Sequence, residues 1–160
     1  MKGTSGSGSD FTIGAILRLI ARLLQFVLAL TVAGLYGVDL HNAHKAHVYA
    51  DSKWVYAEVV AGISAITALV YTLPIPMIKP WFLWPLDTLI FILYMALFGT
   101  FGKMYINENP EGDAGITRMK HAVWVDLVNM LLWFFTAVYG AVIFVMHRRG
   151  RTLHTGRAQV

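Results

Sequence analysis

Four long apolar segments dominate this sequence and restrict what the chain can fold into. Each has roughly 20 residues or more, the length that a helix needs to cross a hydrocarbon core about 30 Å thick. The strands of a membrane barrel would alternate apolar and polar residues, and these segments do not. We therefore predict an all-α membrane protein with four transmembrane helices, at about Phe11 to Val38, Trp54 to Leu73, Trp81 to Gly102 and Val123 to Met146.

The composition favours a lipid environment. Apolar residues make up 57% of the chain and charged residues 14%, whereas soluble domains carry about 25% charged residues. The chain has no cysteine, which excludes disulfide scaffolds, thiolate metal sites and cysteine nucleophiles. In a membrane protein, a net charge of +4 first indicates how the chain is oriented in the membrane and that it contacts anionic lipid. We expect no binding to nucleic acid.

The chain divides into one membrane domain and two polar ends. We expect residues 1–13, which are largely Gly and Ser, to be disordered, residues 14–147 to form the four-helix domain, and residues 148–160 to form a basic cytosolic tail. Short connections make successive helices antiparallel neighbours. The sequence thus predicts an antiparallel bundle with connections at His41 to Lys53, Pro74 to Pro80 and Lys103 to Ala122.

The distribution of Lys and Arg predicts the orientation. Both chain ends and the connection at 74–80 together carry more of these residues than the other two connections. The side richer in Lys and Arg faces the cytoplasm, so both termini should be cytosolic. The basic cluster of Arg148, Arg149 and Arg151 would also contact anionic lipid, at about 1 kcal/mol per cation.

Three acidic residues lie in or near the predicted spans, where a charge is costly. We expect Asp87 to pair with Arg22 and to hold the first helix against the third. Glu58 and Asp126 lie nearer the opposite face, which suggests no continuous polar path between the two faces. The cationic side chains available there to neutralise them are Lys53, Lys103, Lys120 and His121.

Two other sets of polar residues are candidates for ligand binding. Asp126 and Asn129 share one side of a helix and could coordinate a cation, although bonding to a neighbouring helix is the more common use of such residues. His41, His44 and His47 have a spacing that could form a zinc or copper site on a helix, or could simply be a solvated or pH-sensing loop. We expect no bound cofactor.

Small residues form stripes that predict close helix packing. Ala57, Ala61 and Ala65 recur every fourth residue in the second segment, and Gly37 ends the first. Such stripes let helix backbones approach each other closely. The contact could lie within the bundle or between copies of the chain, and we take the first as the default.

Several short motifs resemble those of MARVEL-domain proteins of the fungal tetraspan type. The resemblance covers about residues 14–150 and implies membrane apposition, sorting of lipids and proteins into patches, and vesicle trafficking, with no catalytic residues. The chain differs from tetraspanins and claudins, whose outer loops carry cysteines. The motifs are Arg22-Leu23-Leu24-Gln25, Gly34-Leu35-Tyr36-Gly37, Asp87, Leu97 to Tyr105, and Asp126-Leu127-Val128-Asn129 with Trp133 and Tyr139-Gly140.

We therefore expect a non-enzymatic multi-pass protein of the plasma membrane or of endomembrane vesicles, with membrane lipids and other membrane proteins as partners. One alternative is a channel formed by several copies, and another is an accessory subunit of a membrane complex. A third is an enzyme that acts on lipid, which would need acidic and histidine side chains to converge in one pocket. The only candidates for that pocket are His44, Glu58, His121 and Asp126.

Overall fold

The computed structural model describes residues 7–47, 51–73 and 83–152, and these residues are almost entirely helical. Each helix is long and apolar enough to cross a membrane, as the four apolar segments predict. The chain therefore has the build of a multi-pass integral membrane protein. The helices are α1 (Ser7–Lys45), α2 (Ser52–Thr72), α3 (Trp84–Tyr105) and α4 (Ala114–Thr152).

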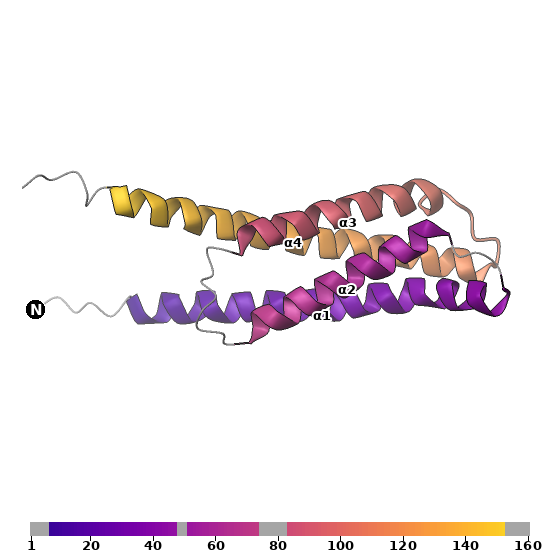
Figure 1. Ribbon diagram of the computed structural model, residues 1–160, viewed down its shortest axis with the longest axis horizontal. Coiled ribbons are helices and arrows are strands. Elements are labelled where there is room, and N and C mark those ends of the chain that lie inside the picture. Colours follow the sequence, from indigo (N-terminus) through magenta and orange to yellow (C-terminus); the bar gives the residue numbers. More distant parts are fainter. Residues whose placement is uncertain (1–6, 48–50, 74–82, 153–160) are drawn as a thin grey trace, which may run out of the picture.

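The four helices form one elongated bundle (Figure 1). The start of α1 and the end of α4 lie at one end of it, and the joints between α1 and α2 and between α3 and α4 lie at the other. Helix α1 packs mainly on α2, and α3 packs mainly on α4, while α1 and α4 join these two pairs. Helices α1 and α3 are therefore diagonal across the interior, and a side chain must be long to connect them.

Local sequence signals mark where three of the helices begin. Asp51 precedes α2 and its carboxylate accepts the backbone N–H of Lys53 at 3.0 Å. Asp113 does the same before α4, where it accepts the N–H of Gly115 at 2.6 Å. Pro85 lies in the first turn of α3, where a missing N–H costs nothing. Carboxylates before a helix satisfy backbone donors that have no partner within the helix.

Helices α1 and α4 are longer than the hydropathy of the sequence predicts. Helix α1 already begins at Ser7, so the expectation that residues 1–13 are disordered is wrong for residues 7–13, and residues 1–6 lie outside the described chain. Once a helix is nucleated, each further residue adds a hydrogen bond at little cost. Helix α4 ends at Thr152, so the first part of the expected tail at 148–160 is helical, and residues 153–160 lie outside the description.

The helices also extend further into the connections than expected. Helix α1 continues to Lys45 and α4 begins at Ala114, whereas we expected loops at 41–53 and 103–122. Hydropathy detects only the apolar part of a helix that faces lipid. The end of α1 and the start of α4 are more polar, and they are held by contacts with each other. Met119 and Ala122 of α4 are buried there, and Arg118 forms an ion pair with Asp39 of α1.

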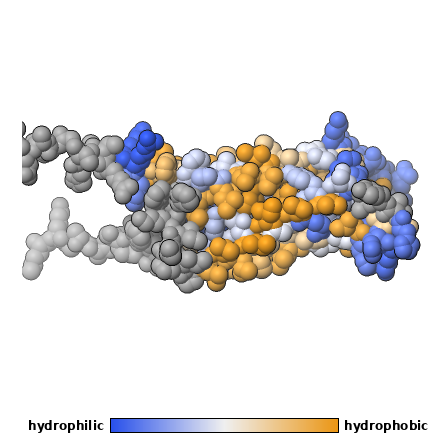
Figure 2. Space-filling model, viewed as in Figure 1, coloured by the Kyte–Doolittle hydropathy of each residue, from blue (hydrophilic) through white to orange (hydrophobic). Residues whose placement is uncertain are grey.

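The outer surface separates into an apolar middle and polar ends (Figure 2). Large aliphatic and aromatic side chains are exposed on all four helices, such as Leu17, Ile66, Leu89 and Phe135. In water this surface would cost a great deal of free energy, but in a bilayer the lipid tails cover it. The surface is therefore consistent with four spans in lipid.

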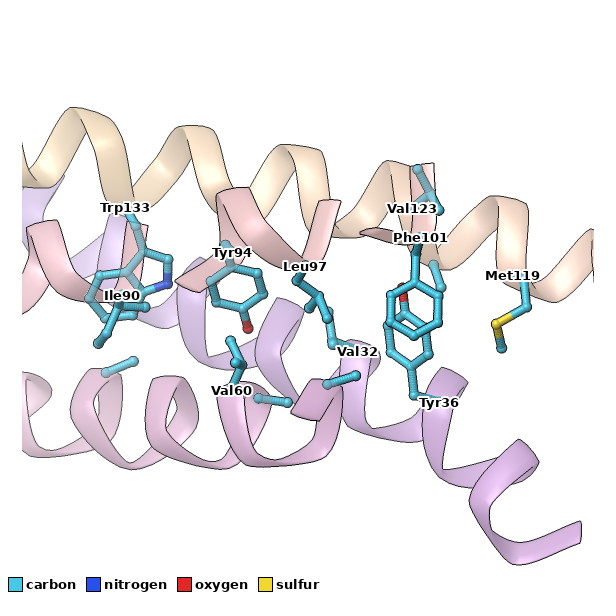
Figure 3. Packing of buried hydrophobic residues seen from close by; sticks show 14 residues of the cluster. Val32, Tyr36, Val60, Ile90, Tyr94, Leu97, Phe101, Met119, Val123 and Trp133 are labelled. Carbon is cyan, nitrogen blue, oxygen red and sulfur yellow. The ribbon is translucent and has the colours of Figure 1, made fainter. Parts of the chain in front are cut away.

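The interior contains an apolar core (Figure 3). Tyr36 of α1 packs against Phe101 of α3, with ring centroids 4.5 Å apart. Leu97, Tyr94 and Trp133 follow in that order along the interior, and all three are fully buried (Figure 3). Many of the other buried core residues have small side chains, because α2 contributes several alanines to the core.

Candidate functional site

The most polar part of the interior is centred on Arg22 of α1. Its guanidinium donates to Oδ2 of Asp87 on α3 at 2.6 Å and to Oε1 of Gln25 at 2.9 Å. Gln25 in turn donates to the hydroxyl of Thr136 on α4 at 3.2 Å. We call Arg22, Gln25, Asp87 and Thr136 the Arg22 cluster. It brings together the two residues that the sequence predicts as an ion pair.

Two aromatic rings enclose the charge of Arg22. Its guanidinium carbon lies 4.7 Å from the centre of the Tyr71 ring on α2 and 5.3 Å from that of Trp133 on α4. A cation over an aromatic face is attracted by the electron density of the ring. Arg22 thus contacts side chains from all three other helices, and it fixes their relative positions near one end of the bundle.

A hydrogen bond between α2 and α4 follows one turn further into the interior. The indole N–H of Trp133 donates to the hydroxyl of Ser64 at 3.1 Å, and both residues are fully buried. A tryptophan buried in an apolar environment needs such a partner for its N–H group. Ser64 lies within the alanine stripe of α2, so this stripe of small residues also provides a polar contact.

A second polar group occupies the other half of the bundle. The phenol of Tyr36 on α1 donates to Oδ2 of Asp126 on α4 at 2.6 Å. Asn129 lies one turn after Asp126, and Tyr94 of α3 has its hydroxyl close to Ser64 and Asn129. Tyr36, Tyr94, Asp126 and Asn129 are all completely buried, and we call them the Asp126 cluster.

The surroundings of Asp126 and Glu58 differ from the sequence-based expectation. Neither residue forms an ion pair within the described part of the chain, so the lysines and the histidine that could have neutralised them do not do so. Asp126 points into the bundle and not toward its charged end. Glu58 lies on α2, and its carboxylate packs against Gly37 of α1. A Cβ atom added to Gly37 would lie 3.2 Å from Oε1 of Glu58.

Buried polar groups therefore extend much further through the bundle than the sequence indicates. The buried face of α4 carries Asp126, Asn129 and Trp133, with Thr136 one turn beyond. At 1.5 Å per residue, these positions cover about 15 Å along the axis. The sequence indicated only the acidic residues near the two faces, whereas the structure adds neutral polar side chains between them, because the helical repeat turns all of these side chains inward.

The Arg118–Asp39 ion pair closes the far end of the interior. It joins α4 to α1 eight residues before Asp126, which is about 12 Å along the helix. Both side chains are mostly buried, at 24% and 17% exposure. The sequence places Arg118 in the predicted connection at 103–122, where nothing indicates a role in packing.

The predicted packing residues lie where helices meet. Ala57, Ala61 and Ala65 are buried on α2, and Ala68 continues their stripe. Gly37 lies on the facing part of α1 beside Glu58. The small residues of these two helices therefore serve contacts within the chain, between its closely packed helices α1 and α2.

The three histidines do not form a metal site. His41 and His44 lie on the last turns of α1, while His47 follows the helix with a left-handed backbone, φ 53°. All three are exposed. No group of three His, Asp or Glu side chains that could hold a metal ion occurs anywhere in the described residues. The three-residue spacing does not place the three histidines on one helix face, because α1 ends at Lys45, before His47.

The pocket required for a lipid enzyme is likewise not formed. His44 and His121 are exposed, whereas Asp126 is completely buried. These side chains therefore do not meet at one surface.

At the other end of the bundle, Arg148 and Arg149 are exposed on the last turns of α4, and Arg151 follows on the same helix.

Sequence reasoning assigned no site role to six residues of this polar interior, which are Gln25, Tyr36, Ser64, Tyr94, Trp133 and Thr136. One signal could have found those on α1. Arg22, Gln25 and Tyr36 lie at intervals of three and eleven residues, which places all of them on one face of a helix. The same face carries the completely buried Ala29 and Val32, so it is the interior face.

Comparisons with known proteins add no relative to this description. No family model, no curated protein and no solved structure matches the chain.

Proposed function

We propose that this protein is a non-enzymatic, multi-pass membrane protein that organises membrane patches and supports vesicle trafficking or membrane apposition. Its helices would form an antiparallel bundle with both termini in the cytosol, in the plasma membrane or in endomembrane vesicles. The resemblance to MARVEL-domain proteins in residues 14–150 supports this proposal. Its partners would be anionic lipids on the cytosolic side and other membrane proteins.

One observation carries the proposal: the middle of the described surface is apolar on all four helices and is therefore suited to contact with lipid (Figure 2). The connections at 46–51 and 106–113 are short, and the exposed side chains of the four helices are mainly large and apolar. Several polar groups of the interior join one helix to another. A chain of this build acts on its surroundings mainly through its lipid-facing surface.

The lipid part of the proposal can be tested with purified protein in nanodiscs of mixed neutral and anionic lipid. We expect native mass spectrometry to find a monomer or dimer that retains anionic lipids. The triple variant Arg148→Gln, Arg149→Gln, Arg151→Gln should retain fewer of them. The matched control Lys45→Gln, Lys53→Gln, Lys103→Gln removes the same charge from the other end and should retain as many as the parent.

A second test addresses organisation directly. Labelled protein in giant vesicles that separate into two lipid phases should concentrate in one phase or at the boundary, and should recruit anionic lipid there. An even distribution in all lipid mixtures would contradict the proposal. A closed ring of four or more copies, with conductance that Asp126→Ala abolishes, would favour the channel alternative.

A further inference from the structure

The Asp126 cluster has more unsatisfied polar atoms than any packing role requires. Oδ1 of Asp126, both amide atoms of Asn129 and the hydroxyl of Tyr94 are buried without a hydrogen-bond partner in the described structure. All three residues have 0% exposure. Each such group costs free energy when it is buried unpaired. Four such atoms in one cluster form a set of groups that could bind a polar ligand.

The charge of the site indicates what that ligand would be. Asp126 has one hydrogen bond, from Tyr36, and no cationic partner among the described residues. An ionised carboxylate that is fully buried is stable only when a positive charge accompanies it. A single proton would satisfy Asp126 but would leave the amide of Asn129 with no partner beyond the nearby hydroxyl of Tyr94.

The available ligands are of one chemical kind. Asp126, Asn129 and Tyr94 each offer an oxygen, and the hydroxyl of Ser64 lies close to that of Tyr94. Oxygen ligands bind hard cations, and divalent ions are usually held by several carboxylates. One carboxylate together with neutral oxygens balances a single positive charge.

We propose that the Asp126 cluster is a binding site for a small monovalent cation, with Na⁺ as the ion of suitable chemistry. Asp126 Oδ1 and Asn129 Oδ1 are the main ligands, and Tyr94 contributes its hydroxyl. Asp126 and Asn129 lie three residues apart on α4, so their side chains are neighbours on one face. Tyr36 holds the second carboxylate oxygen and so orients the first. This site is independent of the proposed membrane-organising function.

The test is thermal unfolding of the purified protein in detergent, followed by tryptophan fluorescence. NaCl replaces choline chloride at constant ionic strength and constant pH. A ligand that binds only the folded state raises the Tm as its concentration rises above its Kd. We expect a saturable increase, about 3–6 °C when Na⁺ is tenfold above its Kd, and a smaller increase with K⁺.

Two variants connect the effect to the site. Asp126→Asn should abolish the sodium dependence, and Asn129→Ala should raise the Kd for Na⁺ at least tenfold. Asp113→Asn is the matched control, because it removes the same charge at the start of α4 while keeping a side chain that can cap the helix. It should respond to Na⁺ as the parent does.

Three results would overturn the proposal. The first is a parent protein whose Tm is equal in sodium and choline chloride, which would mean that a proton or water occupies the site. The second is a sodium response that persists in Asp126→Asn. The third is a sodium response that Asp113→Asn also loses. If Asp126→Asn does not fold, the shift in Kd for Asn129→Ala and the parent response decide the matter.

Discussion

Arg22 and Asp87 form an ion pair 2.6 Å long between two helices that are not neighbours in the bundle. The arginine side chain crosses the interior from α1 to reach α3, between rings from α2 and α4. Only 12% of the Arg22 side chain and 2% of the Asp87 side chain are exposed. The pair therefore holds a diagonal contact that backbone packing cannot provide.

Removal of Arg22 should strongly destabilise the protein. Arg22→Leu leaves the carboxylate of Asp87 buried without a countercharge, and breaking such a pair costs about 3–5 kcal/mol. The measurement is the free energy of unfolding in mixed micelles. The double variant Arg22→Leu, Asp87→Leu removes both charges and should recover most of the loss. If the double variant is as unstable as the sum of the two single variants, the residues do not act as a pair.

Gly140 should not tolerate even a methyl group. A Cβ atom at this position would lie 2.9 Å from Cβ of Trp84 and 3.5 Å from its Cα. Trp84 is the first residue of α3, so the clash would push that helix away from α4. We expect Gly140→Ala to lower the free energy of unfolding by about 1–3 kcal/mol, as overpacking does.

Gly99 provides the control for this substitution. It is exposed on α3, and a Cβ atom there would meet nothing within 4 Å. Gly99→Ala should be neutral or stabilising by up to about 1 kcal/mol, because alanine favours a helix more than glycine. Equal effects of the two substitutions on unfolding in mixed micelles would show that α3 and α4 do not approach closely at Gly140.

The contact between α1 and α2 should depend on the small size of Ala61. This residue is 1% exposed, and Ala61→Leu would insert three carbon atoms between closely packed helices. We expect a loss of about 1–3 kcal/mol in the free energy of unfolding. The neighbouring Gly62→Leu places the same side chain toward lipid, where nothing lies within 4 Å, and should not destabilise. Equal losses would contradict the assignment of the alanine face to packing within the chain.

Acidification should weaken the start of α2. The backbone N–H of Lys53, followed by the charge of its ammonium group, holds the pKa of Asp51 below its ordinary value of 3.8. A lowered pKa in the folded state means that the carboxylate stabilises the helix above pH 4. This stabilisation is lost as the pH falls through the folded pKa.

The measurement for Asp51 is an NMR titration of its carboxyl carbon, together with amide exchange at the start of α2. The pKa should lie below 3.8, and amide exchange should accelerate at acid pH. Asp51→Asn keeps a capping side chain without a titrating group, so the start of its α2 should be insensitive to pH. A titration at or above the ordinary value would contradict the capping role.

The sequence predicts the helices well because hydropathy is a local property. Each predicted span overlaps one helix of the structure, and the Arg22–Asp87 pair follows from the cost of isolated charges in lipid. Helix ends were less predictable. Residues 39–45 and 114–122 are polar enough to resemble loops, yet they are helical, because contacts such as Arg118–Asp39 hold them together.

The Asp126 cluster could be predicted only in part. The spacing of Asp126 and Asn129 shows that they share a helix face, but not what lies opposite that face. Tyr36 is 90 residues from Asp126 in sequence, and no local pattern relates the two. Their contact depends on the register between α1 and α4, which is a property of the whole bundle.

The sequence by itself determined that this chain forms four helices long and apolar enough to cross a membrane. In lipid the backbone must satisfy its own hydrogen bonds, and a helix does so within one apolar segment. The tertiary structure alone decided which polar side chains meet. Arg22 donates to Asp87, Trp133 donates to Ser64, and Tyr36 donates to Asp126. The physical reason is that hydropathy acts residue by residue, whereas the pairing of buried polar groups depends on how four helices rotate and slide against each other.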